Sequence, residues 1–229
     1  MLREVNQSLF SKKENSKLNI FLNVVIVVIL VALAIEIIFA STYSGIYVVG
    51  SSMNNTLKGA VETRVGSYYI ADTGGDYVYA DRHAEPDYRD IVVVLRSDGT
   101  NIIKRVIAKG GDTVMLERGK LYIKFAGTQD FVLIEEKYVD DENNNPDENN
   151  FCVGSGHLVE SDKLFLLGDN RNVSVDSRAS GDFPVDSVLG VVADWSVSGK
   201  GFFTAIHKFF YFDLPSAFGV DNRMKRSVN

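Results

Sequence analysis

The chain has 229 residues, of which 45% are hydrophobic and 24% charged, and its formal net charge is −6. This length suits one ordinary domain plus an accessory segment, and the composition excludes disorder or collagen-like repeats for the bulk of the chain. The single cysteine, Cys152, excludes an internal disulfide framework and a thiolate metal cluster. The acidic balance argues against a nucleic-acid binder, which would normally be basic.

A hydrophobic stretch, residues 18–40, follows a basic N-terminus. As a helix it would be about 34 Å long, which is enough to cross a bilayer core of roughly 30 Å. A cleaved signal peptide has a shorter apolar core and a small-residue cleavage site, and Ile38 and Phe39 do not fit such a site. We therefore predict a retained transmembrane anchor.

The charges that flank this stretch predict its orientation. Four Lys or Arg residues precede it, and none lies within the fifteen residues after Ala40. Positive charge is retained on the cytoplasmic side, so the N-terminus is predicted to be cytoplasmic and the large domain extracytoplasmic. The predicted organisation is a cytoplasmic basic N-terminus (1–17), a transmembrane anchor (18–40), an extracytoplasmic domain (41–200) and an aromatic and basic tail (201–229).

Beyond the anchor the pattern is typical of β structure. Short apolar runs alternate with Gly, Asp and Asn turn signals, and no stretch between 60 and 200 has helical periodicity. The fold class predicted is mainly β, an antiparallel sheet or barrel-like domain behind one N-terminal transmembrane helix. The expected strands are 77–80, 91–95, 114–116, 121–125, 131–134, 164–167 and 188–192, with a further buried strand at 102–107.

Two segments have an unusual amino-acid composition, and each allows a structural and a functional interpretation. The Asp- and Asn-rich residues 140–150 suggest a calcium loop, but Pro146 occupies the glycine position of an EF-hand and Cys152 the glutamate position. A solvated loop is expected instead. The aromatic residues of 202–212 either pack against the domain or contact lipid headgroups, and the sequence leaves both open.

A serine and a lysine suggest chemistry. Ser52 lies in a Gly-Ser-Ser turn ten residues past the anchor, and Lys104 lies between β-branched residues of the predicted buried strand. Burial lowers the pKa of an amine, and a neutral amine beside a hydroxyl is a general base. Lys109 is a rival base, but its neighbouring glycines predict a solvated turn.

A third segment, residues 168–178, is a dense polar cluster after an apolar strand. Ser174, Asp176 and Arg178 alternate in it, so an extended backbone would place all three on one face. Four boxes occur in order along the chain: Ser-Met-x-x-Thr-Leu, Arg-Asp-Ile-Val-Val-Val, Lys-Arg-Val-Ile before Gly-Gly-Asp, and Gly-Asp-Asn-Arg-x-x-Ser-x-Asp-Ser-Arg. Together they resemble the bacterial type I signal peptidases, the membrane-bound Ser/Lys leader peptidases, over roughly residues 18–192.

The resemblance implies a role for each matching residue. Ser52 would be the nucleophile, Lys104 its base, and Ser174 would orient the lysine amine, while Asp176 and Arg178 would form a supporting ion pair. The family's oxyanion hole uses the nucleophile's backbone N–H. The residues implied to line shallow pockets for small side chains at substrate positions −1 and −3 are Val48, Met53, Leu57, Ile102 and Ile103.

Two positions depart from the family pattern. Gly50 stands where some members have a serine that supplies a second oxyanion donor, which puts that donor in doubt. Asn55 replaces the usual proline, which loosens the turn but removes no catalytic group. A Ser-His-Asp triad is the alternative chemistry, and the three histidines, His83, His157 and His207, are all expected to be surface residues.

The function predicted is that of a membrane-anchored serine endopeptidase, a signal peptidase I that cleaves signal peptides from exported preproteins by a Ser/Lys dyad. No cofactor and no metal are expected. The partners expected are preproteins and the lipid bilayer, with no nucleic acid and a monomeric enzyme in the cell membrane. A non-catalytic, membrane-tethered binding module and a self-cleaving Ser/Lys regulator are the alternatives.

Overall fold

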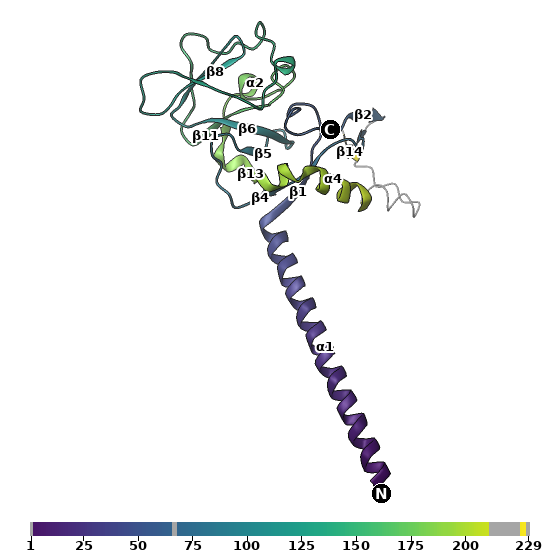
Figure 1. The fold of residues 1–229 in the computed structure, drawn as a ribbon. Coiled ribbons are helices and arrows are strands. Elements are labelled where there is room, and N and C mark those ends of the chain that lie inside the picture. Colours follow the sequence, from purple (N-terminus) through teal and green to yellow (C-terminus); the bar gives the residue numbers. More distant parts are fainter. Residues whose placement is uncertain (1, 66–67, 211–224, 228–229) are drawn as a thin grey trace. The chain divides into compact units, whose positions relative to one another are not determined.

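The computed structural model describes residues 2–65, 68–210 and 225–227, and the chain divides into two compact units, Met1–Tyr43 and Ser44–Asn229 (Figure 1). The first unit is one helix, α1 (Leu2–Thr42). Its residues Lys17–Thr42 contain an 18-residue window with a mean hydropathy of 3.1, and none of the side chains in that window is buried. By length and composition this part could cross a membrane, and it contains the predicted 18–40 stretch.

The second unit is built on a seven-stranded sheet in the order β1-β4-β13-β5-β6-β11-β12 (Figure 1). The pairings from β4 to β12 are antiparallel, and β6 is the longest strand. Its strands are β1 (Tyr43–Tyr47), β4 (Tyr77–Asp81), β5 (Ile91–Leu95), β6 (Asn101–Lys109), β11 (Lys163–Leu167), β12 (Phe183–Pro184) and β13 (Val188–Val192).

Two smaller antiparallel sheets accompany it. One has the order β10-β7-β8-β9, with β10 (His157–Leu158), β7 (Thr113–Glu117), β8 (Lys120–Lys124) and β9 (Val132–Ile134). The other has the order β14-β3-β2, with β14 (Lys225–Ser227), β3 (Tyr68–Ala71) and β2 (Glu62–Val65). Over the part of the chain that is described, none of the three sheets closes on itself, so they form open sheets and not a barrel.

Three apolar clusters fill the second unit. One joins the residues after β1 to the main sheet through Val48, Met53, Leu57 and Val93. A second joins the main sheet to the four-stranded sheet, with Phe165 fully buried at its centre, and a third covers β5, β6 and β11. Strand β6 contributes to all three, because its side chains alternate between the two faces of the sheet.

The prediction of a mainly antiparallel β fold is confirmed. Each expected strand overlaps an observed one, and most predicted strand ends lie within one residue of the observed ends. Two short α-helices, α2 (Ser177–Ser180) and α3 (Asp194–Ser198), and two 3-10 turns, η1 (Asp141–Asn143) and η2 (Val185–Ser187), lie within the described part of 60–200, where the sequence has no helical periodicity. Helix α4 (Lys200–Lys208) follows. Elements of one turn are too short to have a periodicity, and a local cap defines α2: the Asp176 side chain accepts a hydrogen bond from Arg178 N.

Candidate active site

The turn that carries Ser52 begins at Gly50, whose φ of +82° lies in the left-handed region. The turn is closed by a hydrogen bond from Leu57 N to Met53 O at 2.8 Å, and Gly50 N donates to Ala60 O at 2.9 Å. Ser52 itself is half-buried. No backbone hydrogen bond occupies its N–H within the described residues, so this N–H can donate to another group.

Lys104 lies on β6 with only 3% of its surface exposed. Its Nζ is 2.7 Å from Ser52 Oγ and donates to Ile103 O at 2.8 Å. Burial lowers the pKa of Lys104 to about 8, against the smaller opposing effect of Asp176. A hydroxyl and an amine that is readily deprotonated are therefore in direct contact.

The 168–178 segment approaches this pair from the end of β11. Asn170 N donates to Ser52 O at 3.0 Å, which ties the segment to the turn. Gly168 is at the closest approach: a Cβ there would lie 2.3 Å from Ser174 Oγ and 2.5 Å from Ser52 O. Only glycine fits between these two groups.

The expected arrangement of Ser174, Asp176 and Arg178 needs two corrections. Residues 169–173 form turns and 177–180 a helix, so the segment is not extended and the alternation argument fails. Ser174 Oγ is buried without a hydrogen-bond partner, so it does not hold the Lys104 amine in this structure. Arg178 Nε does donate to Asp176 Oδ1 at 2.8 Å, and Asp176 Oδ2 accepts from Gly168 N at 3.1 Å.

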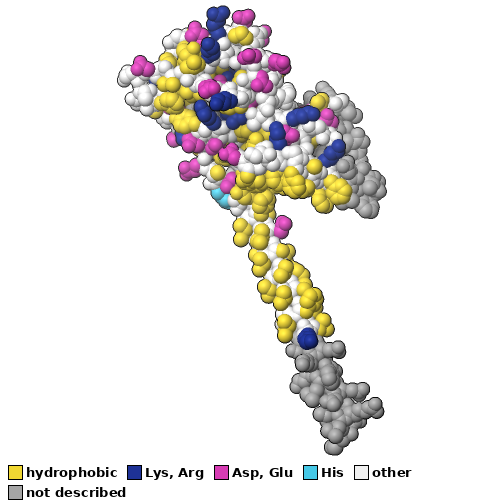
Figure 2. Space-filling view, viewed as in Figure 1, with side chains coloured by type: hydrophobic (Ala, Val, Ile, Leu, Met, Phe, Trp, Pro, Cys, Tyr) yellow, Lys and Arg dark blue, Asp and Glu magenta, His cyan; other side chains and the backbone are white. Residues whose placement is uncertain are grey.

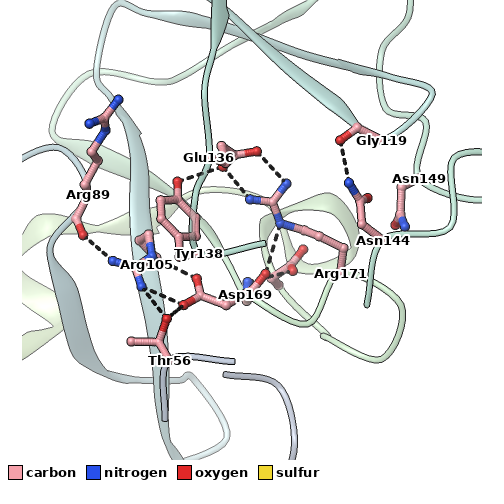
Figure 3. Close-up of polar contacts among 12 residues, drawn as sticks. Thr56, Arg89, Arg105, Gly119, Glu136, Tyr138, Asn144, Asn149, Asp169 and Arg171 are labelled. Carbon is pink, nitrogen blue, oxygen red and sulfur yellow. Dashed lines mark hydrogen bonds and ion pairs between the residues drawn. The ribbon is translucent and has the colours of Figure 1, made fainter. Parts of the chain in front are cut away.

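A buried ion pair beside the dyad was missed by sequence reasoning (Figure 3). Arg105 donates two hydrogen bonds to Asp169, Nε to Oδ1 at 2.8 Å and Nη2 to Oδ2 at 2.6 Å. Thr56, which ends the nucleophile turn, donates to Asp169 Oδ2 at 2.5 Å, so this carboxylate joins the turn to β6. A signal was present, because an arginine in an apolar strand needs a carboxylate partner.

A second buried pair extends this network (Figure 3). Arg171, fully buried, donates to both carboxylate oxygens of Glu136, at 3.0 and 2.5 Å. Tyr138 packs its ring 3.9 Å from the Arg105 guanidinium, and its burial raises the pKa of its hydroxyl. Two buried ion pairs, one with Arg105 and one with Glu136, therefore hold the segment 168–178 in place.

A cleft of about 330 Å³ opens at the dyad. Its lining includes Ser52 and Lys104 together with three of the five residues expected to form substrate pockets, namely Val48, Ile102 and Ile103. The other two, Met53 and Leu57, do not line it. They are almost completely buried in the apolar cluster that packs beneath the turn.

The Asp- and Asn-rich segment 140–150 is mostly exposed, as expected for a solvated loop, but it also contacts the neighbouring turns. Asn149 is 4% exposed and accepts a hydrogen bond from Arg178 Nη1 at 2.7 Å. Asn143 donates to Asn55 Oδ1 at 2.7 Å, and Asn55 has a φ of +96°. The amide side chains of this loop therefore satisfy polar groups of the neighbouring turns.

The other candidate bases lie away from the cleft. Lys109, the rival base, is the last residue of β6 and forms an ion pair with Asp87 at 2.8 Å. His157 is half-buried beside Asp182, with Nε2 at 2.9 Å from Oδ1, and His83 is exposed. The expectation that His207 is a surface residue is wrong: it is buried, with its ring 4.1 Å from that of Tyr77. Across the described residues, no group of three His, Cys, Asp or Glu side chains is placed to hold a metal ion.

The architecture and the cleft define a class: a mainly β domain in which a serine contacts a buried lysine on an interior strand of the largest sheet. Comparison with known families agrees. The chain matches the family model for signal peptidases, peptidase S26, over residues 18–195. It therefore belongs to the signal peptidase family, peptidase S26, and the resemblance to bacterial type I signal peptidases is confirmed.

Individual relatives support this assignment. Signal peptidase I of Streptococcus pneumoniae serotype 4 is 30% identical over 176 residues, covering 65% of this chain and 79% of that protein. Signal peptidase I U of Bacillus subtilis is 29% identical over 152 residues, covering 65% and 72%. The solved structure of a signal peptidase I from Enterococcus faecalis V583 has 28% identity, covers 48% of this chain and 98% of that one, and superposes with a TM-score of 0.39.

Proposed function

We propose that this protein is a membrane-anchored serine endopeptidase that removes signal peptides from exported preproteins, with Ser52 as nucleophile and Lys104 as general base. One observation carries the proposal: a lysine amine that is 3% exposed lies 2.7 Å from a serine hydroxyl in an open cleft. Family membership supports a protease of signal peptides, and the contact supports Ser52 and Lys104 as the groups that would do the chemistry.

The proposed mechanism starts from the neutral amine. One Lys104 N–H is engaged by Ile103 O, which orients the lone pair toward Ser52. Ser52 Oγ loses its proton to Nζ as it attacks the scissile carbonyl, and the ammonium then gives that proton to the leaving amine. Water, deprotonated by the same amine, hydrolyses the acyl-enzyme ester and regenerates both residues.

The oxyanion of the tetrahedral intermediate would be bound by the free Ser52 N–H. Gly50 offers no side-chain donor and its own N–H is engaged with Ala60 O, so it is not a second donor in this proposal. Val48, Ile102 and Ile103 give the cleft an apolar lining, which suits the small side chains proposed at substrate positions −1 and −3. Asp176 and Arg178 are proposed to hold the supporting segment in place.

The proposed location follows from α1. Its apolar part would span the cell membrane once, with residues 1–17 in the cytoplasm, residues 41–200 as the extracytoplasmic peptidase domain and 201–229 as a tail. Preproteins that carry signal peptides and the lipid bilayer are the partners proposed. The enzyme is proposed to act as a monomer, without a cofactor and without nucleic acid.

The test of the dyad is cleavage of a preprotein by the detergent-solubilised full chain. Ser52→Ala, Lys104→Ala and the double variant should lose nearly the same activity, because neither residue works without the other. Lys109→Ala is the matched control and should retain activity. Multiplicative losses in the double variant would contradict the pairing, full activity of Ser52→Ala would exclude Ser52 as the nucleophile, and a wild type that cleaves no preprotein would favour the non-catalytic binding module.

The test of orientation uses the single cysteine. Cys152 is exposed, so a membrane-impermeant thiol reagent should label it in intact cells. A Cys152→Ser variant with a new cysteine at Ser11 should be labelled only after the cells are permeabilised. The reverse labelling pattern would refute the proposed topology.

A further inference from the structure

The Asp- and Asn-rich segment 140–150 lies outside the cleft, but it contacts the nucleophile turn, residues 50–57, which carries Ser52. Its 3-10 turn η1 ends at Asn143, whose Nδ2 donates to Asn55 Oδ1 at 2.7 Å. The two residues are 88 positions apart in the chain. This contact therefore joins a segment without a role in the proposed mechanism to the turn that carries the nucleophile.

Asn55 has a backbone conformation that few residues adopt. Its φ of +96° lies in the left-handed region, where the Cβ of an L-residue is crowded and glycine is favoured. The chain reverses around Asn55, and Leu57 N returns to Met53 O at 2.8 Å. A conformation of this kind persists where the surrounding structure holds it.

The nucleophile turn is held on its inner side by two of its own side chains. Met53 is 1% exposed in the apolar cluster, and Thr56 donates to Asp169 Oδ2 at 2.5 Å. Asn55 is on the exposed side of the turn, where it accepts the hydrogen bond from Asn143. Asn143 therefore holds the turn at the residue whose conformation is the least favourable.

Asn143 is itself held in place by the 168–178 segment. Asn172 N donates to Asn143 O at 3.2 Å, and Asn172 Nδ2 donates to Glu142 O at 3.1 Å. Asn172 Oδ1 accepts from Asn145 N at 2.7 Å. The 168–178 segment thus contacts the nucleophile turn directly and also reaches it through η1.

Amide groups, rather than carboxylates, make these contacts. Figure 2 shows the Asp and Glu side chains of the second unit scattered over its surface, with Lys and Arg side chains among them. Over the described ranges, no group of three His, Cys, Asp or Glu side chains could hold a metal ion. The many asparagines of 140–150 are therefore explained by hydrogen bonds to neighbouring segments and not by a cation site.

We infer that Asn143 is a positioning residue: by holding Asn55 at positive φ, it keeps the nucleophile turn in the conformation that places Ser52 Oγ 2.7 Å from Lys104 Nζ. The inference rests on the proposed function, because the dyad belongs to that proposal. Glycine adopts positive φ without a side-chain contact. Replacement of Asn55 by glycine should therefore compensate for the loss of the Asn143 side chain.

The first measurement is cleavage of a preprotein by the detergent-solubilised full chain, with kcat expressed per folded enzyme. Asn143→Ala should lower kcat about fivefold, the ratio that corresponds to one net hydrogen bond, and leave KM unchanged because Asn143 does not line the cleft. Adding Asn55→Gly should restore most of this loss, whereas adding Asn55→Ala should not. Asn150→Ala is the matched control, because its side chain contacts residues 118, 146 and 147 and not the nucleophile turn.

A purely structural role predicts the opposite order of the double variants. Glycine lowers stability through the entropy of the unfolded chain, so Asn55→Gly would then deepen the loss caused by Asn143→Ala. Full activity of Asn143→Ala, no restoration by Asn55→Gly, or an equal loss in Asn150→Ala would each overturn the inference.

A second measurement needs no peptidase activity. In a Cys152→Ser background, the Ser52→Cys thiol would lie beside the Lys104 amine, which should lower the pKa of the thiol and speed its alkylation by iodoacetamide near pH 7. Asn143→Ala should slow this alkylation several-fold, and Asn55→Gly should restore it. A wild type that cleaves no preprotein would contradict the proposed function, while the alkylation rates would still decide the inference; rates that Asn143→Ala leaves unchanged would overturn it.

Discussion

Replacement of Lys104 by methionine should abolish catalysis and at the same time stabilise the fold at neutral pH. Burial lowers the pKa of this amine from 10.5 in the unfolded chain to about 8 in the folded protein. Each pKa unit corresponds to about 1.4 kcal/mol, so the folded state holds the charged lysine at a cost of about 3 kcal/mol at pH 7. Methionine has similar length and no charge, so Lys104→Met removes this cost.

The sign of the pH dependence follows from proton linkage. Between pH 8 and 10.5 the unfolded chain binds more protons at Lys104 than the folded chain does, so the free energy of unfolding of the wild type should rise with pH across this window. The variant lacks the group and should lack that rise. The two proteins should therefore differ by about 3 kcal/mol at pH 7 and converge above pH 10.5.

The assay is denaturant unfolding of both proteins in the same detergent at a series of pH values. Ser52→Ala is the matched control, because it also removes catalysis but leaves the amine in place. A Lys104→Met protein less stable than wild type at pH 7, or a constant difference between the two from pH 7 to 10.5, would refute the reasoning.

Three further outcomes are expected. Cleavage should rise with pH through the pKa of Lys104, about 8, and stay high above it, because only the neutral amine accepts the nucleophile's proton; a limb near pH 6.5 would instead point to a histidine base. Gly168→Ala should lose most of its activity, because the new Cβ has no room beside the dyad, whereas Gly201→Ala in α4 meets no atom within 4 Å and should leave cleavage intact; equal activity of the two variants would contradict the packing argument. Glu136→Gln should lower the free energy of unfolding by about 3 kcal/mol, because it leaves the buried Arg171 guanidinium without a counter-charge, and an unchanged denaturation midpoint would contradict this.

Local patterns in the sequence were sufficient to predict the larger secondary-structure elements. The apolar stretch within α1 and the short apolar runs of β5 and β13 each consist of neighbouring residues, so the bounds of Lys17–Thr42 and of these two strands were predicted to within a residue or two. One-turn helices such as α2 depend on a single cap, and β14 of the smallest sheet depends on β3, a partner far along the chain. Neither leaves a periodic signal in the sequence.

The candidate site likewise has residues that the sequence predicts and residues whose role the sequence does not determine. Ser52 and Lys104 could be proposed from the sequence because a lysine among β-branched residues is unusual and the motif boxes accompany it. The roles of Met53 and Leu57 could not be judged, since an apolar side chain after the nucleophile suits a pocket and a core equally well. Both are buried in the cluster beneath the turn and, unlike Val48, neither lines the cleft, which favours a core role.

The sequence by itself determined the anchor-like helix, the β character of the main domain and the residue types of the dyad, because each depends on side chains that are near one another in the chain. Only the tertiary structure brought Arg105 to Asp169, across 64 positions, and Ser52 to Lys104, across 52. It also left Ser174 Oγ unbonded and exposed Phe202 and Ile206 on the outer side of α4. These features depend on which charged and polar groups become buried together and form hydrogen bonds or ion pairs with one another. The groups that meet are determined by the packing of segments that are far apart in the sequence.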